Sequence, residues 1–208
     1  MKILLISDIP PCRNYTAGLV LDQLCRFLKP GSVAGFFVVN ASLTDARLTP
    51  DLEWMPVRFE DKPAESWTGA SLNGPRMSRL ASFRGELNNR LHVLPPLIDR
   101  ITSFGRAFGA NALWIVLQGQ TEIQIALPLA QRLRVPLLCQ MWDPPYFWMD
   151  AHNVNFFHKT YFLNLYARTL RRSTRVFAAS WYMADKYRDD YGADTVPFLP
   201  SLDIRLAK

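Results

Sequence analysis

Short apolar runs alternate along this chain with longer segments in which apolar residues recur every three or four positions. The runs predict buried strands, and the periodic segments predict amphipathic helices. The strands are expected at residues 3–7, 33–39, 54–57, 112–117, 135–140, 175–179 and 195–199. The helices are expected at 16–28, at 79–108 with a break at Pro95–Pro96, and at 121–133, 155–172 and 181–191. This order predicts an α/β fold: a Rossmann-like, doubly wound, mainly parallel sheet with helices on both faces.

The segment boundaries predict one domain over residues 1–200, with 201–208 as a tail or the start of an interdomain linker. Residues 58–75 are polar and contain Pro, Gly and Ser, so we expect a loop there. The apolar start of the chain is too short for a secretion signal, and no apolar run reaches the roughly 20 residues of a membrane span. A cytoplasmic protein is therefore expected.

The amino-acid composition excludes several classes of protein. The 208 residues are 49% hydrophobic and 20% charged, as in globular proteins. The net charge is +6, but the basic residues form no single stripe and no nucleic-acid motif occurs, so nucleic-acid binding is not expected. The three cysteines are expected to be reduced, with Cys25 and Cys139 as small core residues.

Several catalytic motifs are absent from the sequence. It contains no GxGxxG, no GxxxxGK[ST], no HExxH, no GxSxG and no Asp-x-Asp pair. The three histidines, His92, His152 and His158, are too dispersed for a local metal motif. No metal site is therefore predicted.

Parallel sheets bind ligands beyond the carboxyl ends of their strands. That rule points to the loops at 8–18, 118–122 and 142–148 and to the region around Ser180.

Four segments, taken in order, resemble the N-terminal domain of the large retaining glycosyltransferases of the B fold, group 1 or family 4. They are Met1–Asp8 followed by Thr16-Ala17-Gly18, the strand 113–117 leading into Gln118-Gly119, the strand 135–138 ending in Trp142-Asp143-Pro144, and Arg172–Ser180 continuing through Tyr191-Gly192 to Asp203. The sequence departs from the family at Pro200-Ser201-Leu202-Asp203, which stands where members have an Asn-Gly-Val-Asp-like turn.

The resemblance implies an acceptor-side domain that works with a donor-binding domain after Asp203. The substrates would be a nucleotide sugar and a glycan, lipid-linked or small-molecule acceptor, with no cofactor and no metal. Because the chain stops at Lys208, the resemblance implies little or no activity without a C-terminal donor-binding half. A non-catalytic Rossmann-like module that binds a nucleotide or a protein partner is the alternative.

The resemblance and the strand ends together give candidate site residues. Asp143 is the catalytic candidate, which would orient an acceptor or sugar hydroxyl; the alternative is a turn-forming aspartate before proline. The substrate-binding candidates are Arg13, Tyr15, Thr16, Gly18, Gln118, Gly119, Glu122, Trp142 and Ser180. Four of them have a simpler alternative role. Arg13 would be a solvated loop arginine and Gly18 an ordinary glycine at a helix start. Glu122 would stabilise the dipole of its own helix, and Ser180 would be an N-cap.

One segment is dense in aromatic residues. Phe156–Phe162 follows Trp142, Tyr146, Phe147 and Trp148, and Arg168, Arg171 and Arg172 come after it. One hypothesis is peripheral contact with the inner face of a membrane, with the arginines near lipid phosphates. The alternative is that these rings pack a helix against the sheet.

Overall fold

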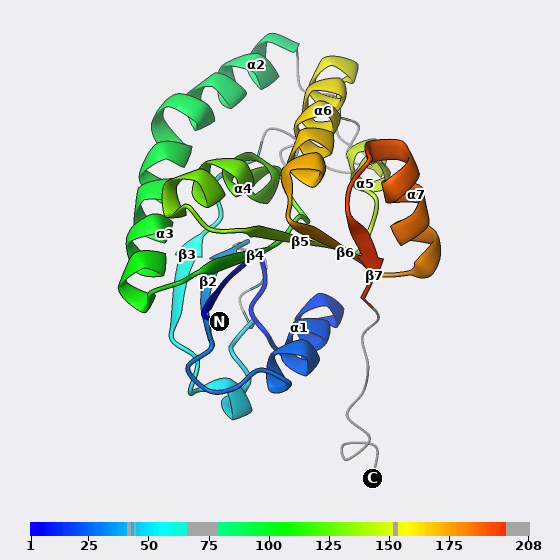
Figure 1. Cartoon of the computed structure of the whole chain (residues 1–208). Coiled ribbons are helices and arrows are strands. Elements are labelled where there is room, and N and C mark those ends of the chain that lie inside the picture. The colour runs from blue at the N-terminus through cyan, green and yellow to red at the C-terminus, as the bar shows by residue number, and fades with distance from the viewer. Residues whose placement is uncertain (41–42, 44, 66–78, 152–153, 199–208) are drawn as a thin grey trace.

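The computed structural model describes residues 1–40, 43, 45–65, 79–151 and 154–198. Seven strands form one sheet: β1 (Ile3–Ser7), β2 (Val33–Val39), β3 (Val57–Asp61), β4 (Ala112–Val116), β5 (Leu137–Met141), β6 (Arg175–Ala178) and β7 (Thr195–Pro197). Every neighbouring pair is parallel, and the order across the sheet is β3-β2-β1-β4-β5-β6-β7 (Figure 1). The predicted Rossmann-like α/β fold is confirmed.

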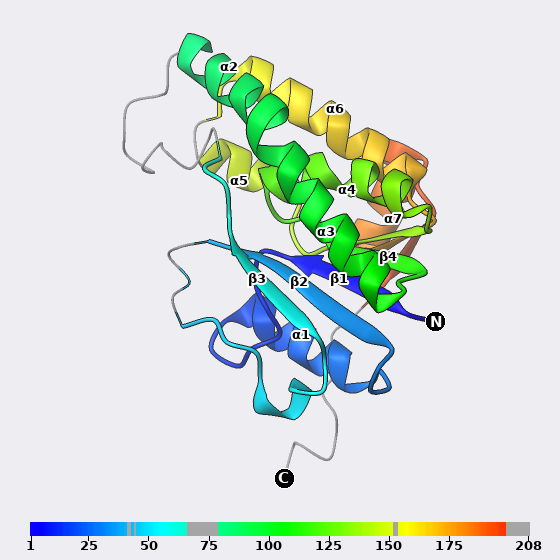
Figure 2. The ribbon, with the colours of Figure 1, turned by 90° about the vertical axis from the view of Figure 1, so that its left-hand side faces the viewer.

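The described helices connect these strands. They are α1 (Thr16–Arg26), the 3-10 turn η1 (Pro50–Leu52), α2 (Arg79–Asn88), the π-helical turn η2 (Asn89–Val93), α3 (Leu94–Phe108), α4 (Gln120–Leu133), α5 (Pro145–Ala151), α6 (Phe156–Arg172) and α7 (Trp181–Tyr191). Figure 2 shows α2 and α3 as one continuous rod that crosses the sheet, with α6 alongside α2.

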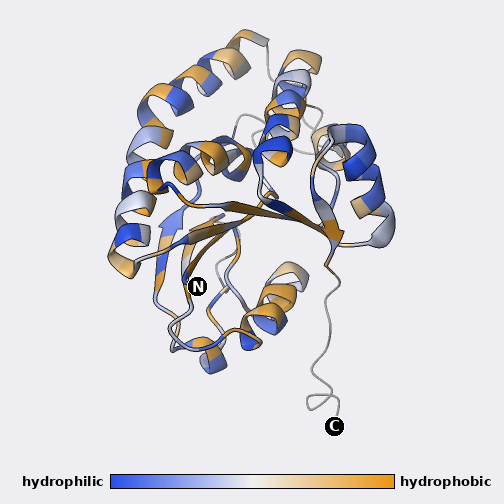
Figure 3. Cartoon of the chain, in the orientation of Figure 1, coloured by the Kyte–Doolittle hydropathy of each residue, from blue (hydrophilic) through white to orange (hydrophobic). Residues whose placement is uncertain are grey.

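The two faces of the sheet are covered unequally. On one face, alternate strand residues such as Leu4, Ile115 and Cys139 pack against α3, α4, α6 and α7. On the other face, residues such as Leu5 and Trp114 pack against α1 and the segment around η1. Figure 3 shows the hydrophobic residues concentrated along the strands, while the helices alternate between hydrophobic and hydrophilic. Both cores follow from strands whose residues are buried on both sides of the sheet.

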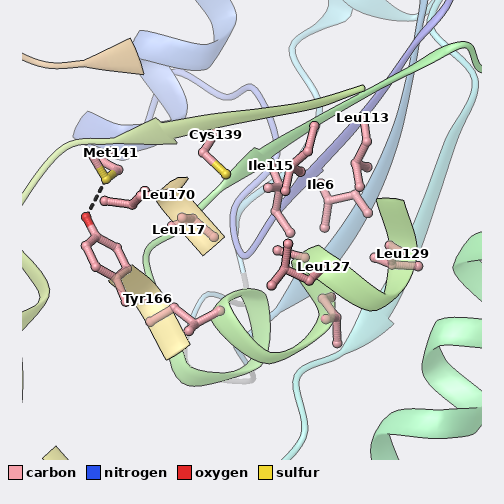
Figure 4. Packing of buried hydrophobic residues seen from close by; sticks show 14 of the residues in the cluster. Ile6, Leu113, Ile115, Leu117, Leu127, Leu129, Cys139, Met141, Tyr166 and Leu170 are labelled. Atoms are coloured by element: carbon pink, nitrogen blue, oxygen red, sulfur yellow. Dashed lines mark hydrogen bonds between the residues drawn. The ribbon is translucent and has the colours of Figure 1, made fainter. Parts of the chain in front are cut away.

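A polar contact between Tyr166 and Met141 lies within the larger core. The Tyr166 hydroxyl, on α6, donates to Met141 Sδ at the end of β5, amid apolar side chains (Figure 4). Burial raises the pKa of Tyr166, so the phenol stays neutral and acts as a donor. This contact joins α6 to the sheet.

Some predicted boundaries were wrong. The third strand begins at Val57 and runs to Asp61, so it occupies part of the predicted loop; residues 54–56 come before it. The helices expected to start at Thr16 and Thr121 caps are instead capped at Tyr15 and Gly119. The helix α5 begins at Pro145, where a loop was expected, because proline suits the first turn of a helix.

The expected break at Pro95–Pro96 takes another form. These prolines lie in the first turn of α3, where their missing N–H groups cost little, and the irregular geometry falls just before them. There the backbone N–H of Leu94 bonds to the carbonyl of Asn89, five residues back, which is the π-helical pattern.

Other end signals are confirmed. The Ser180 hydroxyl accepts a hydrogen bond from the backbone N–H of Met183 at 3.1 Å, as an N-cap does. Gly192 ends α7 in the left-handed conformation, with φ 62°. The predicted end of the last strand and the tail at 201–208 lie outside the described residues.

Two further sequence predictions can be compared with the structure. All three cysteines are free and buried, which confirms that Cys25 and Cys139 are core residues. Within the described part of the chain, no helix combines the length and the apolar character needed to cross a bilayer.

Candidate functional site

The strand order places a ligand crevice beside β1. This strand lies between β2 and β4, so the connections run in opposite directions on its two sides. Ligands of open parallel sheets bind at such a switch point, beyond the carboxyl ends of the strands. Asp8 follows β1 there, and Gln118-Gly119 follows β4.

A buried cluster of charges fills this switch point. Lys62, the first residue after β3, has a side chain only 8% exposed. Its Nζ lies 3.2 Å from Asp8 Oδ2, 3.3 Å from Glu65 Oε1 and 3.2 Å from Glu122 Oε2. We call these four residues the Lys62 cluster.

The cluster holds one cation against three carboxyl groups. Burial alone lowers the pKa of Lys62, but attraction to Glu122, Glu65 and Asp8 outweighs it and raises that pKa, so the lysine is charged. Burial raises the pKa of Glu122, and the negative charges of Asp8 and Glu65 add to this against the opposing effect of Lys62. Neither Glu122 oxygen has a hydrogen-bond partner among the described residues. A proton on Glu122 therefore relieves the excess negative charge.

The Lys62 cluster also begins α4. Its N-cap, Gly119, has no side chain, and Glu65 Oε1 instead accepts from the backbone N–H of Thr121 at 2.9 Å and from the Thr121 hydroxyl at 3.0 Å. A Cβ on Gly119 would lie 2.4 Å from Lys62 Nζ and 2.5 Å from Glu122 Oε2. A side chain at position 119 would therefore displace the charged groups of the cluster from their present positions.

Three other candidates follow neighbouring strands along the same edge. Trp142 and Asp143 come after β5, and Ser180 follows the end of β6. Asp143 is exposed, whereas the buried Trp142 Nε1 has no hydrogen-bond partner in the described part of the protein. The topology thus brings these residues to one edge with Gln118 and Gly119.

The first loop forms a separate corner with α1. Arg13 donates to Asp51 Oδ2 at 2.6 Å and lies 4.0 Å from Asp22, so it belongs to a network of ion pairs. A Cβ on Gly18 would lie 2.1 Å from Cys12 Sγ, so the first loop packs on this glycine. Tyr15 and Thr16 are the N-cap and first residue of α1.

A second polar group lies between α2 and α6. Glu86 is 7% exposed and accepts hydrogen bonds from Gln120 at 2.7 Å, Gln124 at 2.5 Å and Arg90 at 2.6 Å. Burial raises the pKa of Glu86, although Arg90 opposes this. Near it, His158 is 9% exposed, and its Nε2 has no partner among the described residues.

Lys62, Glu65, Glu86 and His158 were missed as site residues. Placing β3 at 54–57 hid the fact that Lys62 directly follows a strand, as Asp8 does. Correct placement of that strand would have pointed to Lys62. The local pair with Arg90 does not mark Glu86 as buried, because the two glutamines that complete its environment, Gln120 and Gln124, are more than 30 residues away along the chain.

The aromatic segment divides between surface and core. Phe162 is fully buried, which fits the packing alternative, whereas Phe156 and Phe157 are 74% and 61% exposed. Arg168, Arg171 and Arg172 lie at the other end of α6, about 18–24 Å along the helix from Phe156 at 1.5 Å per residue. These arginines are thus separated from the exposed rings along the helix, and their contact with a membrane stays a prediction.

No family model and no curated protein sequence matches this chain. Its fold does match solved structures. Sucrose-phosphate synthase from Thermosynechococcus elongatus aligns with a TM-score of 0.58 and 10% identity, over 99% of this chain and 50% of that one. UGT89C1 from Arabidopsis thaliana, solved with UDP, aligns with a TM-score of 0.54 and 13% identity, over 97% of this chain and 53% of that one. This chain thus spans about half the length of these structures and has the fold of one half of a B-fold glycosyltransferase.

Proposed function

We propose that this chain is the acceptor-side half of a B-fold glycosyltransferase of the retaining group 1 or family 4 type. Together with a donor-binding half, it would transfer a sugar from a nucleotide sugar to an acceptor. The observation that carries the proposal is the match of nearly the whole chain to one half of two B-fold glycosyltransferases. The order of the four segments that resemble the family supports the N-terminal side.

In this proposal the acceptor meets the edge formed by the ends of β4, β5 and β6. Asp143 is exposed there, so its carboxylate is free to orient an acceptor hydroxyl. Gln118, Trp142 and Ser180 would line the same edge, and the loop with Arg13, Tyr15, Thr16 and Gly18 would border it. Gly119 and Glu122 would act indirectly, by holding the Lys62 cluster and the start of α4 in place.

The first turn of α4 bears on where the donor diphosphate binds. A helix N-terminus is a common phosphate site, but Glu65 already accepts from the backbone N–H of Thr121. A second anion at this turn would meet the three carboxyl groups of the Lys62 cluster. The proposal therefore assigns the diphosphate to the donor-binding half.

The test is to purify the protein from its host and to measure polypeptide mass and nucleoside diphosphate release from UDP-, GDP- and ADP-sugars. We expect a donor-binding half, in the same polypeptide or a bound partner, and release that depends on acceptor. Residues 1–208 alone should show none above background. If no such half accompanies the protein and no sugar nucleotide is turned over, the proposal fails in favour of a non-catalytic binding module.

Asp143 has its own test in the active protein. We expect Asp143→Asn to lower kcat by about 100-fold or more, as loss of a group that acts on the reacting hydroxyl does. Asp185→Asn, at another exposed aspartate, is the matched control and should leave kcat unchanged. An Asp143→Asn enzyme with normal kcat would remove this residue from the mechanism.

Peripheral membrane contact is a further part of the proposal. Leu80, Phe83, Leu91, Phe156 and Phe157 are each at least 58% exposed, and they lie on α2, η2 and the start of α6. Large exposed apolar groups of this kind favour contact with apolar partners such as a bilayer. Failure to sediment with vesicles that contain anionic lipid would exclude this contact.

A further inference from the structure

A cavity of about 270 Å³ lies between α2 and α6. Its lining residues follow helical spacing on both elements, so one face of α2 and η2 looks onto one face of α6. They are Phe83, Glu86, Leu87, Arg90, Phe157, His158 and Tyr161. Phe83, Leu87 and Phe157 are 45–61% exposed and form an apolar rim, whereas Glu86 and His158 are buried and form a polar floor.

Glu86 is a fixed part of this floor. Its two oxygens accept from the side-chain amides of Gln120 and Gln124 and from Arg90. Because both glutamines belong to α4, these bonds attach the pocket floor to the helix that starts at the Lys62 cluster. The pocket is therefore anchored next to the carboxyl edge of the sheet.

His158 is the group that lacks a partner. Its backbone N–H is capped by Asn155 Oδ1 at 3.1 Å, and its Nδ1 lies 3.3 Å from Asn155 Nδ2 and 3.4 Å from Asn155 Oδ1. Its Nε2 is buried and has no hydrogen bond within the described residues. Buried polar atoms are nearly always hydrogen-bonded, so this nitrogen calls for a ligand atom.

The chemistry of Nε2 narrows the choice of ligand group. If Asn155 donates to Nδ1, then Nε2 of the neutral ring carries the proton and donates; in the other tautomer it accepts. A hydroxyl can both donate and accept, so it satisfies Nε2 in either state. An aliphatic or aromatic body on that hydroxyl would match the rim.

We propose that this pocket binds the apolar body of the acceptor, and that this body is an alcohol or phenol whose hydroxyl, distinct from the reacting hydroxyl that Asp143 orients, pairs with His158 Nε2. The acceptor role rests on the proposed function, while the ligand chemistry rests on the pocket itself. Arg90 stacks on the Tyr161 ring at 4.2 Å and stands between this pocket and a second cavity of about 300 Å³ that both residues also line. The stacked Arg90 and Tyr161 side chains thus limit how long an apolar group this pocket can hold.

The binding test uses two probes that differ only at the polar group, 2-naphthol and 2-methylnaphthalene, in which a methyl group that can neither donate nor accept replaces the hydroxyl. We expect 2-naphthol to bind about three- to tenfold more tightly, the value of one hydrogen bond. The sequence has only three histidines, so their ring signals can be assigned in NMR spectra. Titration with 2-naphthol should shift the His158 signals and leave those of the exposed His92 in place.

Variants test the contributions of the polar floor and the apolar rim to binding separately. His158→Phe keeps a ring of similar size without the nitrogen, so it should bind both probes equally; His92→Phe is the matched control and should keep the preference. Phe157→Ser, at the exposed rim, should weaken both probes by a similar factor and retain the preference. The natural protein alone can overturn the proposal. It fails if 2-naphthol neither shifts the His158 signals nor binds more tightly than the probe without a hydroxyl.

The pocket proposal and the proposed function can be refuted independently, because the probes are tested without a sugar nucleotide. If 2-naphthol engages His158 and no transferase activity is found, the pocket stands and the proposed function falls. If the protein glycosylates acceptors while His158→Phe leaves KM and kcat unchanged, the pocket is not the acceptor site.

Discussion

The Lys62 cluster and the floor of the α2–α6 pocket place buried glutamates against the same helix in opposite ways. In the Lys62 cluster, Glu122 has no hydrogen bond within the described residues beyond its ion pair with the shared Lys62, and a Cβ on Gly119 would meet both side chains. In the floor, Glu86 accepts three hydrogen bonds, and Nε2 of His158, a residue that lines a cavity, has no partner in the described part of the chain. The first arrangement is closed, and the second is open to a ligand. Burial of a charge does not by itself mark a binding site; an unpartnered atom beside space does.

The largest effect should come from removing the only cation of the closed arrangement. Lys62→Met would leave three carboxyl groups buried together, and breaking a buried ion pair costs about 3–5 kcal/mol of the free energy of unfolding. Urea denaturation of Lys62→Met and of the natural protein measures this loss in the free energy of unfolding. The loss should shrink at low pH, where the carboxyl groups are protonated.

Lys186→Met is the control for that variant. Lys186 pairs with Asp190 on the surface of α7, where solvent screening leaves such a pair with little effect on stability. Equal losses for the two lysine variants would contradict the view that the Lys62 cluster holds the switch point together.

A smaller loss is expected from Gly119→Ala. The added methyl would press on Lys62 Nζ and Glu122 Oε2, and overpacking of this kind costs about 1–3 kcal/mol. Gly85→Ala, in α2, meets nothing within 4 Å and should stabilise the protein by about 0.5–1 kcal/mol. Thermal melts of both variants compare them directly. A neutral Gly119→Ala would mean that the cluster has room for a ligand after all.

The smallest effect is a change in pH dependence. Because folding raises the pKa of Glu122, the native state binds more protons than the unfolded state above the ordinary value near 4.5. The contribution of Glu122 to the free energy of unfolding therefore falls as the pH rises above about 4.5. Glu122→Gln should remove the fall, so its stability relative to the natural protein should rise by about 1–2 kcal/mol between pH 5 and pH 8. Urea titrations at each pH measure this.

Glu53→Gln, at an exposed glutamate, is the matched control for that titration. Its stability should follow the natural protein across the same pH range. A parallel profile for Glu122→Gln would show that Glu122 is as ionised in the folded state as in the unfolded one.

The sequence predicted the fold better than it predicted the site. Apolar runs such as Ile3–Ser7 and periodic segments such as Trp181–Tyr191 are local signals, and their element types were confirmed. The Lys62 cluster is not local, since its members come from two loops and a helix far apart in sequence. The edge strand β3 has a largely exposed pattern, so its weak apolar signal put the strand three residues early and concealed Lys62. Asp143 and the other candidates remain predictions about a ligand.

The π-helical turn between α2 and α3 has a consequence for how the pocket can change. A π turn contains one residue more than the α-helical turn it replaces, and each residue in an α-helix advances the side-chain direction by about 100°. The extra residue therefore sets the rotational phase of α2 independently of α3, whose Leu97 and Ile101 stay in the core. Loss of a single codon in this turn would turn Glu86 and Phe83 away from α6 while the sheet kept its cover. Lineages of this fold can thus remodel the pocket by one-residue insertions and deletions.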